Sequence, residues 1–215
     1  MTDNYRHQGL RRRLVEQIRE KGIRDERILE AIGAIPRHLF LDSSFVEFAY
    51  QDKPFPIGSG QTISQPYTVA FMTELLEIQR GSKILEVGTG SGYQACVLLQ
   101  LGAKVYTIER QRQLYLKTKA FLPSLGYSPH FFFGDGYKGL PAFQPFDGIM
   151  VTAGAPEVPE ALLSQLKTGG KLVIPVGVQT QTMLRIIRTG EDTWHRENHG
   201  TFRFVPLLKD KANDI

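Results

Sequence analysis

The stretch LEVGTGSG, residues 85–92, follows a short apolar segment and precedes a helical one. Its three glycines at alternate positions let the backbone turn tightly and approach a ligand without a Cβ in the way. A helix that opens near Ser91 would point its free N–H groups toward that ligand. The stretch therefore predicts a nucleoside-binding turn at the carboxyl end of a strand in a doubly wound α/β sheet.

Strand and helix patterns alternate on both sides of this turn. Short runs of branched and aromatic residues predict buried parallel strands. These runs are residues 83–87, 104–109, 130–134, 146–153 and 171–176. Helical stretches begin near Ser91, Gln111 and Pro156, and Thr168-Gly169-Gly170 is expected as a turn before the last strand. Residues 182–189 and 200–207 alternate like antiparallel strands, with Gly190-Glu191-Asp192 as the turn between them.

The N-terminal part of the chain has a different pattern. Residues 10–20 and 25–35 carry apolar side chains at helical spacing, with Asp25 as the N-cap of the second helix and Pro36 as its stop. Residues 52–65 are rich in Pro, Gly, Ser and Thr and are expected as an ordered loop before a helix that starts at Pro66. We therefore expect a single domain over 1–215: a helical cap and active-site loop (1–80), an α/β core (81–177) and an antiparallel edge (178–215).

Composition limits the class of protein. The 215 residues carry a formal net charge of +4, a single cysteine and no apolar run of the length, about 20 residues, that crosses a bilayer. We expect no disulfide framework, no membrane partner and a cytoplasmic location. Arg11-Arg12-Arg13 is the only dense basic run and fits a solvated helix face, so we expect no nucleic-acid partner.

A glycine fingerprint alone also fits dinucleotide enzymes. Tyr93 stands where such enzymes have their last glycine, and Glu86 places a carboxylate where it suits an ammonium group. Glu109 ends a strand about twenty residues later, where it fits ribose hydroxyls or a partner for Arg110 or Arg112. Asp135, before Gly136, fits the amine of adenine or a simple Asp-Gly turn.

The pattern E-x-G-x-G-x-G resembles the first motif of class I methyltransferases. The loop IGSGQTISQPY, residues 57–67, narrows the likeness, because it resembles the protein-L-isoaspartate O-methyltransferase family, which recognises isoaspartyl residues. The likeness continues through residues 85–94, 105–110, 134–177 and 203–207 and so covers nearly the whole chain. It implies a seven-stranded class I fold with an altered strand order at the end of the sheet.

The resemblance also implies roles for individual residues. Ser64 matches the active-site serine, and residues 61–64 match the stretch over the methyl donor, S-adenosylmethionine. The predicted cofactor-binding residues are Gln61, Thr62, Ile63, Tyr67, Glu86, Gly88, Thr89, Gly90, Glu109, Arg110, Asp135 and Gly136. Val205, Pro206 and Leu207 resemble a strand whose backbone holds the substrate peptide. Leu208 stands where relatives carry threonine, so no side-chain role is carried over to it.

The chemistry implied is methyl transfer to the free α-carboxyl of isoaspartyl residues in damaged proteins, by a monomer. A carboxylate with a pKa of about 3.3–3.7 is already ionised and needs no general base. We therefore expect no metal and no serine–histidine relay. Ser64 would orient the carboxylate, and its alternative role is an N-cap for the helix at Pro66. A methyltransferase for nucleic acid or another small acceptor is the alternative function, which residues 151–156 disfavour because they lack the Asn/Asp-Pro-Pro-Tyr/Phe motif of adenine-N6 enzymes.

Overall fold

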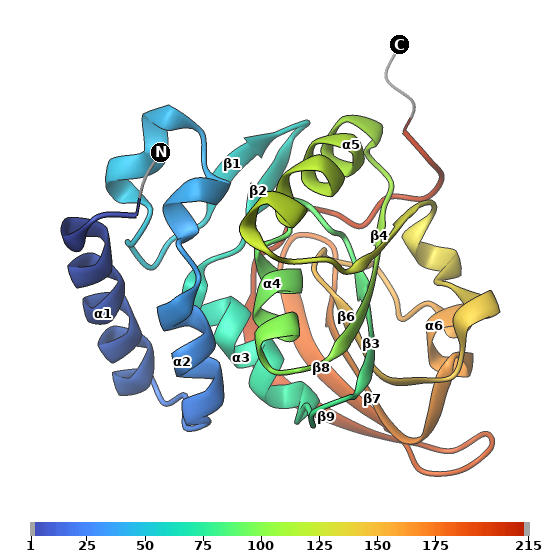
Figure 1. The fold of residues 1–215 in the computed structure, drawn as a ribbon. Coiled ribbons are helices and arrows are strands. Elements are labelled where there is room, and N and C mark those ends of the chain that lie inside the picture. The colour runs from blue at the N-terminus through green and yellow to red at the C-terminus, as the bar shows by residue number, and fades with distance from the viewer. Residues whose placement is uncertain (1–2, 213–215) are drawn as a thin grey trace.

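A seven-stranded sheet forms the centre of the protein, in a computed structural model that describes residues 3–212. The strand order is β5-β4-β3-β6-β7-β8-β9 (Figure 1). The strands are β3 (Lys83–Val87), β4 (Lys104–Glu109), β5 (His130–Phe133), β6 (Phe146–Val151), β7 (Leu166–Val176), β8 (Gln181–Arg188) and β9 (Trp194–Phe202). Strands β3 to β7 are parallel, whereas β8 is antiparallel to both of its neighbours. The predicted doubly wound sheet with an antiparallel end is confirmed.

Helices cover the sheet on both faces. The α-helices are α1 (Tyr5–Glu20), α2 (Glu26–Ala34), α3 (Pro66–Leu76), α4 (Tyr93–Gln100), α5 (Arg112–Phe121) and α6 (Glu160–Ser164). Short 3₁₀ turns lie at Arg37–Phe40 (η1), Ser43–Phe48 (η2), Leu122–Leu125 (η3), Gly136–Lys138 (η4) and Pro141–Phe143 (η5). One core cluster packs the four helices α1, α2, α3 and α4 against the sheet. A second cluster packs α6 against the opposite face. Within residues 3–212, no helix is long and apolar enough to cross a bilayer.

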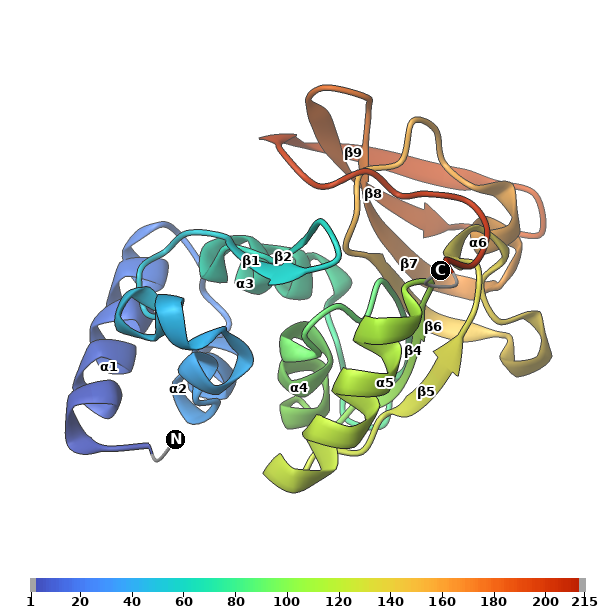
Figure 2. The same ribbon diagram turned by 90° about the horizontal axis from the view of Figure 1, so that it is seen from above.

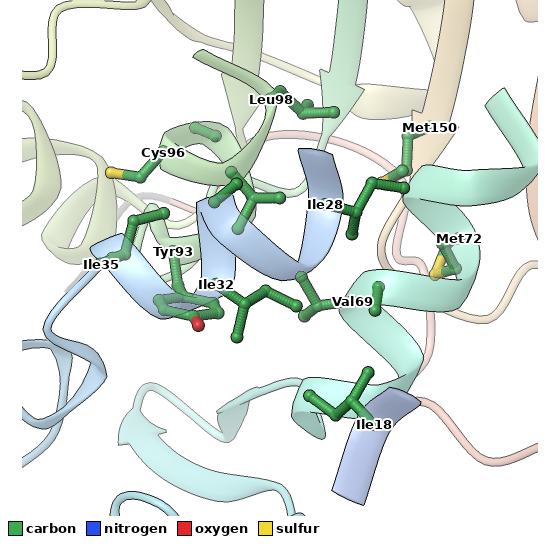
Figure 3. Packing of buried hydrophobic residues seen from close by; sticks show 14 of the residues in the cluster. Ile18, Ile28, Ile32, Ile35, Val69, Met72, Tyr93, Cys96, Leu98 and Met150 are labelled. Atoms are coloured by element: carbon green, nitrogen blue, oxygen red, sulfur yellow. The ribbon is translucent and has the colours of Figure 1, made fainter. Parts of the chain in front are cut away.

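The N-terminal helices form a layer outside α3 and α4 (Figure 2). Figure 3 shows Ile28 and Ile32 of α2 between side chains of α3 and α4, and both are almost fully buried. The Asp25 side chain accepts a hydrogen bond from the Arg27 amide at 3.0 Å, which confirms it as the N-cap of α2. This packing holds α2 against α3 and α4, the two helices that flank the glycine turn and the active-site loop.

Residues 52–65 contain more regular structure than the sequence suggested. The segment is ordered, as expected, but it contains a two-stranded antiparallel sheet of β1 (Phe55–Gly58) and β2 (Gln61–Ile63) that was not predicted. The turn between these strands has left-handed backbone at Gly58, Ser59 and Gly60, which tightens a hairpin that composition alone cannot distinguish from a loop. The helix after it does begin at Pro66, as predicted.

The C-terminal hairpin is displaced from its predicted position. Its second strand is β9, which begins at Trp194 and ends at Phe202, so residues 205–207 do not form the expected strand. They make only an isolated bridge, between Pro206 and Gly154. The hairpin ends at Phe202 because this residue pairs with Gln181, the first residue of β8. The polar sequence of β9 concealed this strand because it lies at the edge of the sheet, where side chains face solvent.

Three smaller boundaries also differ from the predictions. Helix α4 begins at Tyr93, after its N-cap Gly92, and helix α6 begins at Glu160 instead of near Pro156. The Thr168-Gly169-Gly170 segment lies inside β7, at a register shift between β6 and β7. These glycines therefore produce an irregularity within a strand and do not separate two elements.

Replacement of Gly92 tests the turn between β3 and α4. Gly92 has φ +82°, and an added Cβ would lie 2.7 Å from atoms of both Thr118 and Leu122. We expect Gly92→Ala to lower the free energy of unfolding by about 2–4 kcal/mol, through backbone strain and overpacking. Urea unfolding measures this change. Gly9→Ala in α1 is the control, because nothing lies within 4 Å of its Cβ position and alanine should stabilise that helix by up to about 1 kcal/mol. Equal effects of the two substitutions would contradict this account of the turn.

Candidate active site

An open cavity of about 800 Å³ lies at the carboxyl ends of β3, β4 and β6. This is the place where the winding of the sheet reverses and where such folds bind ligands. Most of the predicted site residues meet on its wall. They are Gln61, Thr62, Ile63, Ser64, Gly88, Thr89, Gly90, Glu109, Arg110, Gly136, Val205, Pro206 and Leu207.

The glycine turn forms the floor of the cavity. Gly88 has φ +98°, and a Cβ there would lie 2.4 Å from the hydroxyl oxygen of Thr152. Thr152 donates a hydrogen bond from that hydroxyl to the Gly88 carbonyl at 2.7 Å. The absence of a side chain at this position thus lets β6 hold the turn from below. The turn keeps its backbone open toward the cavity.

Glu109 connects the end of β4 to the glycine turn. One carboxylate oxygen accepts a hydrogen bond from the Gly90 amide at 2.9 Å, and the other accepts one from the Gln111 amide at 2.8 Å. Arg110 also lines the cavity, and its Nε donates a hydrogen bond to the Asp210 carbonyl at 2.9 Å, not to Glu109. Glu109 is therefore a buried acceptor on the cavity wall, and the alternative of a solvent-facing ion-pair partner was wrong.

Glu86 lies beneath the cavity and not on its wall. Its side chain is fully buried, and one oxygen accepts a hydrogen bond from the Thr107 hydroxyl at 2.6 Å. The Thr107 hydroxyl is in turn 2.6 Å from that of Thr89, which does line the cavity. Burial raises the pKa of Glu86 to about 8. Since two hydroxyl groups separate this carboxyl from the cavity, its contact with a cofactor stays a prediction.

Asp135 and Tyr67 also lie outside the cavity wall. The Asp135 carboxylate accepts a hydrogen bond from the Tyr137 amide at 2.9 Å and caps η4, and only its neighbour Gly136 lines the cavity. Tyr67 stacks on Phe71 and faces a second groove. Neither residue lines the cavity, so their contacts with a cofactor stay predictions.

The second groove adjoins the cavity at the β1–β2 hairpin. Four residues line both spaces: Thr62, Ser64, Thr152 and Val205. The groove continues between α3 and the end of β9, where it is lined by Tyr67, Phe202 and Arg203, among others. A molecule in the groove would therefore reach the cavity at Ser64.

The Ser64 hydroxyl does not cap α3. The N-cap of this helix is Gln65, whose own side chain makes no capping hydrogen bond. Asp52 takes the role instead, since its carboxylate accepts from the Tyr67 amide at 2.7 Å and from the Gln65 side-chain amide at 2.9 Å. Among residues 3–212, the Ser64 hydroxyl has no hydrogen-bond partner. The N-cap alternative was wrong, and this hydroxyl remains available to a ligand.

The sequence did not identify several residues that shape this site. Thr152 and Thr107 sit at strand positions that look like ordinary sheet residues, and Asp52 and Arg37 lie far from the glycine motif in the chain. The one signal in the sequence was the position of Arg37, a charged residue just before the apolar residues 39–41. Their roles became visible only when separate elements were brought together.

A group of metal-ligating side chains lies away from the cavity. Single ligand atoms of Asp3, His7 and His38 are within 4.8 Å of one another. The two imidazole rings are stacked, with centroids 3.9 Å apart, so their in-plane lone pairs run side by side instead of converging on one ion. The Asp3 carboxylate already accepts two hydrogen bonds from Arg11. These contacts fit a structural network between the N-terminal segment and η1.

The doubly wound sheet and the glycine-turn cavity together define a class I methyltransferase fold. The sequence profile of the family described as protein-L-isoaspartate(D-aspartate) O-methyltransferase (PCMT) matches residues 9–212. A protein-L-isoaspartate O-methyltransferase of Christiangramia forsetii is 65% identical over 98% of this chain and all of the relative. The corresponding protein of Flavobacterium psychrophilum is 61% identical over the same shares of the two chains.

Two solved structures have the same fold. One, a protein-L-isoaspartate O-methyltransferase, superposes with a TM-score of 0.82 at 30% identity and covers 91% of this chain and 65% of its own. The other, a Plasmodium falciparum structure described as a beta-aspartate methyltransferase (PCMT) in complex with S-adenosyl-L-homocysteine, has a TM-score of 0.79 at 26% identity and covers 93% and 99%. The chain belongs to the protein-L-isoaspartate(D-aspartate) O-methyltransferase family.

The buried carboxyl of Glu86 should make stability depend on pH. Its folded pKa of about 8 lies above the ordinary value of 4.5, so between these two pH values the folded state keeps a proton that the unfolded state has lost. The free energy of unfolding should therefore fall as pH rises through this interval, by up to about 1.4 kcal/mol per pH unit, and level off above pH 8. Glu86→Gln should remove this slope. The comparison uses urea unfolding of both ligand-free proteins from pH 4.5 to 9, and parallel pH profiles would show that Glu86 is ionised in the folded state.

Proposed function

We propose that the protein transfers a methyl group from S-adenosylmethionine to the free α-carboxylate of L-isoaspartyl residues in damaged proteins, which initiates their repair. The observation that carries this proposal is the position of Ser64. Its side chain stands where the cavity beneath the hairpin meets the groove along β9. Family membership supports the same reaction.

The cavity residues fit the cofactor. The glycine turn has space where a Cβ would be, the Glu109 carboxylate suits ribose hydroxyls, and Ile108 and Leu207 offer apolar surface for a base. The Thr89 hydroxyl can reach the amino-acid part, supported from below by Thr107 and Glu86. When bound, S-adenosylmethionine supplies a sulfonium methyl group that a carboxylate oxygen takes directly, while the sulfur keeps the electron pair of the broken bond.

The groove fits an anionic peptide. Lys21 and Arg203 are the charged residues on its wall, and within the described chain no carboxylate lines it. Lys21 is ion-paired with Asp52, so among residues 3–212 Arg203 is the cation of the groove without a carboxylate partner. Positive charge raises the local concentration of an acceptor whose α-carboxyl is ionised at neutral pH. The carbonyl of Val205 and the amide of Leu207 are already bonded to Gly154, so the peptide would use the other edge of this segment.

Ser64 would orient the acceptor without acting as a nucleophile. Its hydroxyl donates a hydrogen bond to one carboxylate oxygen and leaves the other free to face the methyl group. None of the described histidines lines the cavity or the groove, which fits a reaction in which no proton is transferred. The hairpin lies over the glycine turn, since Ile57 is 3.4 Å from the Cβ position of Gly90. Alignment of this kind can lower a barrier by about 7–11 kcal/mol in favourable cases.

We also propose a cytoplasmic monomer that does not act on nucleic acid. Among the described residues, the large exposed apolar side chains are Tyr5, Phe48, Leu116, Val178 and Leu208, which come from five separate segments of the chain. The single cysteine, Cys96, is buried and free, as suits a reducing compartment. Two cations at the groove are few for binding a phosphate backbone.

Replacement of Ser64 tests its role directly. We expect Ser64→Ala to lower kcat about 100-fold, because the carboxylate loses its alignment with the methyl group. The affinity for S-adenosylhomocysteine, measured by calorimetry, should change less than about threefold. Ser59→Ala, in the exposed tip of the same hairpin, is the matched control and should leave both values unchanged. Normal turnover of Ser64→Ala would remove this residue from the mechanism.

Matched peptides test the acceptor. Two peptides that differ only in an isoaspartyl or an aspartyl residue carry the same charge, but only the first presents an α-carboxylate at a kink in the main chain. We expect labelled methyl groups to be transferred to the isoaspartyl peptide at least about 100 times faster, because the groove aligns only that geometry. Equal rates on the two peptides would contradict the proposed selectivity.

A further inference from the structure

Arg37 is a charged side chain in the interior of the protein. It belongs to η1, and its exposed fraction is 0%. Its Nε donates to the Ala49 carbonyl at 3.1 Å, and its Nη2 donates to the carbonyls of Lys53 at 3.3 Å and Ser64 at 2.9 Å. One guanidinium group thus bonds to three separate backbone positions, and two of them, Lys53 and Ser64, flank the β1–β2 hairpin.

This guanidinium has no ion-pair partner within residues 3–212. Burial lowers its pKa to about 10, so it stays charged at neutral pH. A buried charge without a carboxylate partner is costly, and apolar residues of similar volume often fill such a site at least as well. Arg37 therefore has a role other than filling space. Its partners indicate that the role is to order loop carbonyls.

The carbonyl of Ser64 is the partner that matters for the site. The Ser64 hydroxyl has no protein partner of its own, so its direction depends on how the backbone beneath it is held. Asp52 holds the start of the helix that follows, through the Gln65 side chain and the Tyr67 amide. Arg37 alone among the described side chains bonds to the backbone of Ser64.

Arg37 also contacts the wall of the cofactor cavity. The carbon at the centre of its guanidinium lies 5.0 Å from the centroid of the Tyr93 ring, at cation–π distance. Tyr93 is the first residue of α4 and lines the cavity. The same guanidinium therefore touches the element that follows the glycine turn and the residue that faces the acceptor.

We propose that Arg37 is a positioning residue for methyl transfer: it holds the Ser64 backbone at a fixed place relative to the glycine turn, so that the Ser64 hydroxyl aligns the acceptor carboxylate. The inference rests on the proposed role of Ser64. It predicts that loss of the guanidinium lowers turnover through Ser64, while the cofactor cavity keeps its affinity.

The test combines single and double substitutions. We expect Arg37→Lys to lower kcat at least about tenfold, since one ammonium group cannot reach all three carbonyls in the same geometry. The Kd for S-adenosylhomocysteine, measured by calorimetry, should stay within about threefold. In a Ser64→Ala background, Arg37→Lys should cause no further loss of kcat, because the hydroxyl that it positions is gone.

Arg11→Lys is the matched control. Arg11 is also buried and donates to a backbone carbonyl, that of Gly33, at 2.6 Å, but it lines neither the cavity nor the groove. Its replacement should lower the melting temperature and leave kcat within about twofold. If Arg37→Lys does not fold, Arg37→Gln is measured by the same criteria, with all assays well below each melting temperature.

The outcomes separate the inference from the proposed function. If Ser64→Ala lowers kcat and Arg37→Lys does not, the inference is overturned and the proposed function stands. If the two losses multiply in the double variant, Arg37 acts independently of Ser64 and the inference is likewise overturned. If Ser64→Ala has normal turnover, the role proposed for Ser64 is wrong, and the inference that rests on it is overturned as well. A kcat loss in Arg37→Lys that disappears in the Ser64→Ala background supports the inference.

Discussion

The hydrogen bond from the Gly90 amide to the Glu109 carboxylate is the contact on which the site depends. It ties the glycine turn after β3 to the end of β4, while Thr152 of the β6 end holds the same turn through the Gly88 carbonyl. Three neighbouring strands thus fix one short backbone segment. The turn tolerates this only because glycines occupy its left-handed positions. The result is a rigid floor for a cofactor at the point where the sheet reverses its winding.

The upper half of the site is built differently. The β1–β2 hairpin and the start of α3 are not part of the main sheet, so side chains hold them in place. Asp52 and Arg37 bond to backbone and side-chain groups of residues 64–67. Both come from the segment that follows the N-terminal helices. This arrangement connects the segment after α2 directly to the acceptor side, although neither α1 nor α2 contributes to the cavity wall.

The elements predicted from local pattern are correct where one face of a helix or strand is buried, because apolar residues then recur at a regular spacing. The parallel strands, α3 and the N-cap at Asp25 follow from apolar spacing and capping residues. The pattern failed at the β1–β2 hairpin and at β9, where polar residues on an edge or in a small sheet show no apolar alternation. The predicted C-terminal strand ends early, at Phe202, because its partner β8 begins opposite that residue, at Gln181.

The sequence by itself determined the fold class, the glycine turn and the position of most residues on the cavity wall, because these depend on motifs of adjacent residues. Only the tertiary structure decided that Glu86 lies behind two threonine hydroxyls and that Asp52, not Ser64, caps α3. It alone showed Arg37 beneath the Ser64 backbone. These contacts join residues 12 to 27 positions apart, and no local pattern encodes a hydrogen bond that forms when separate elements pack together.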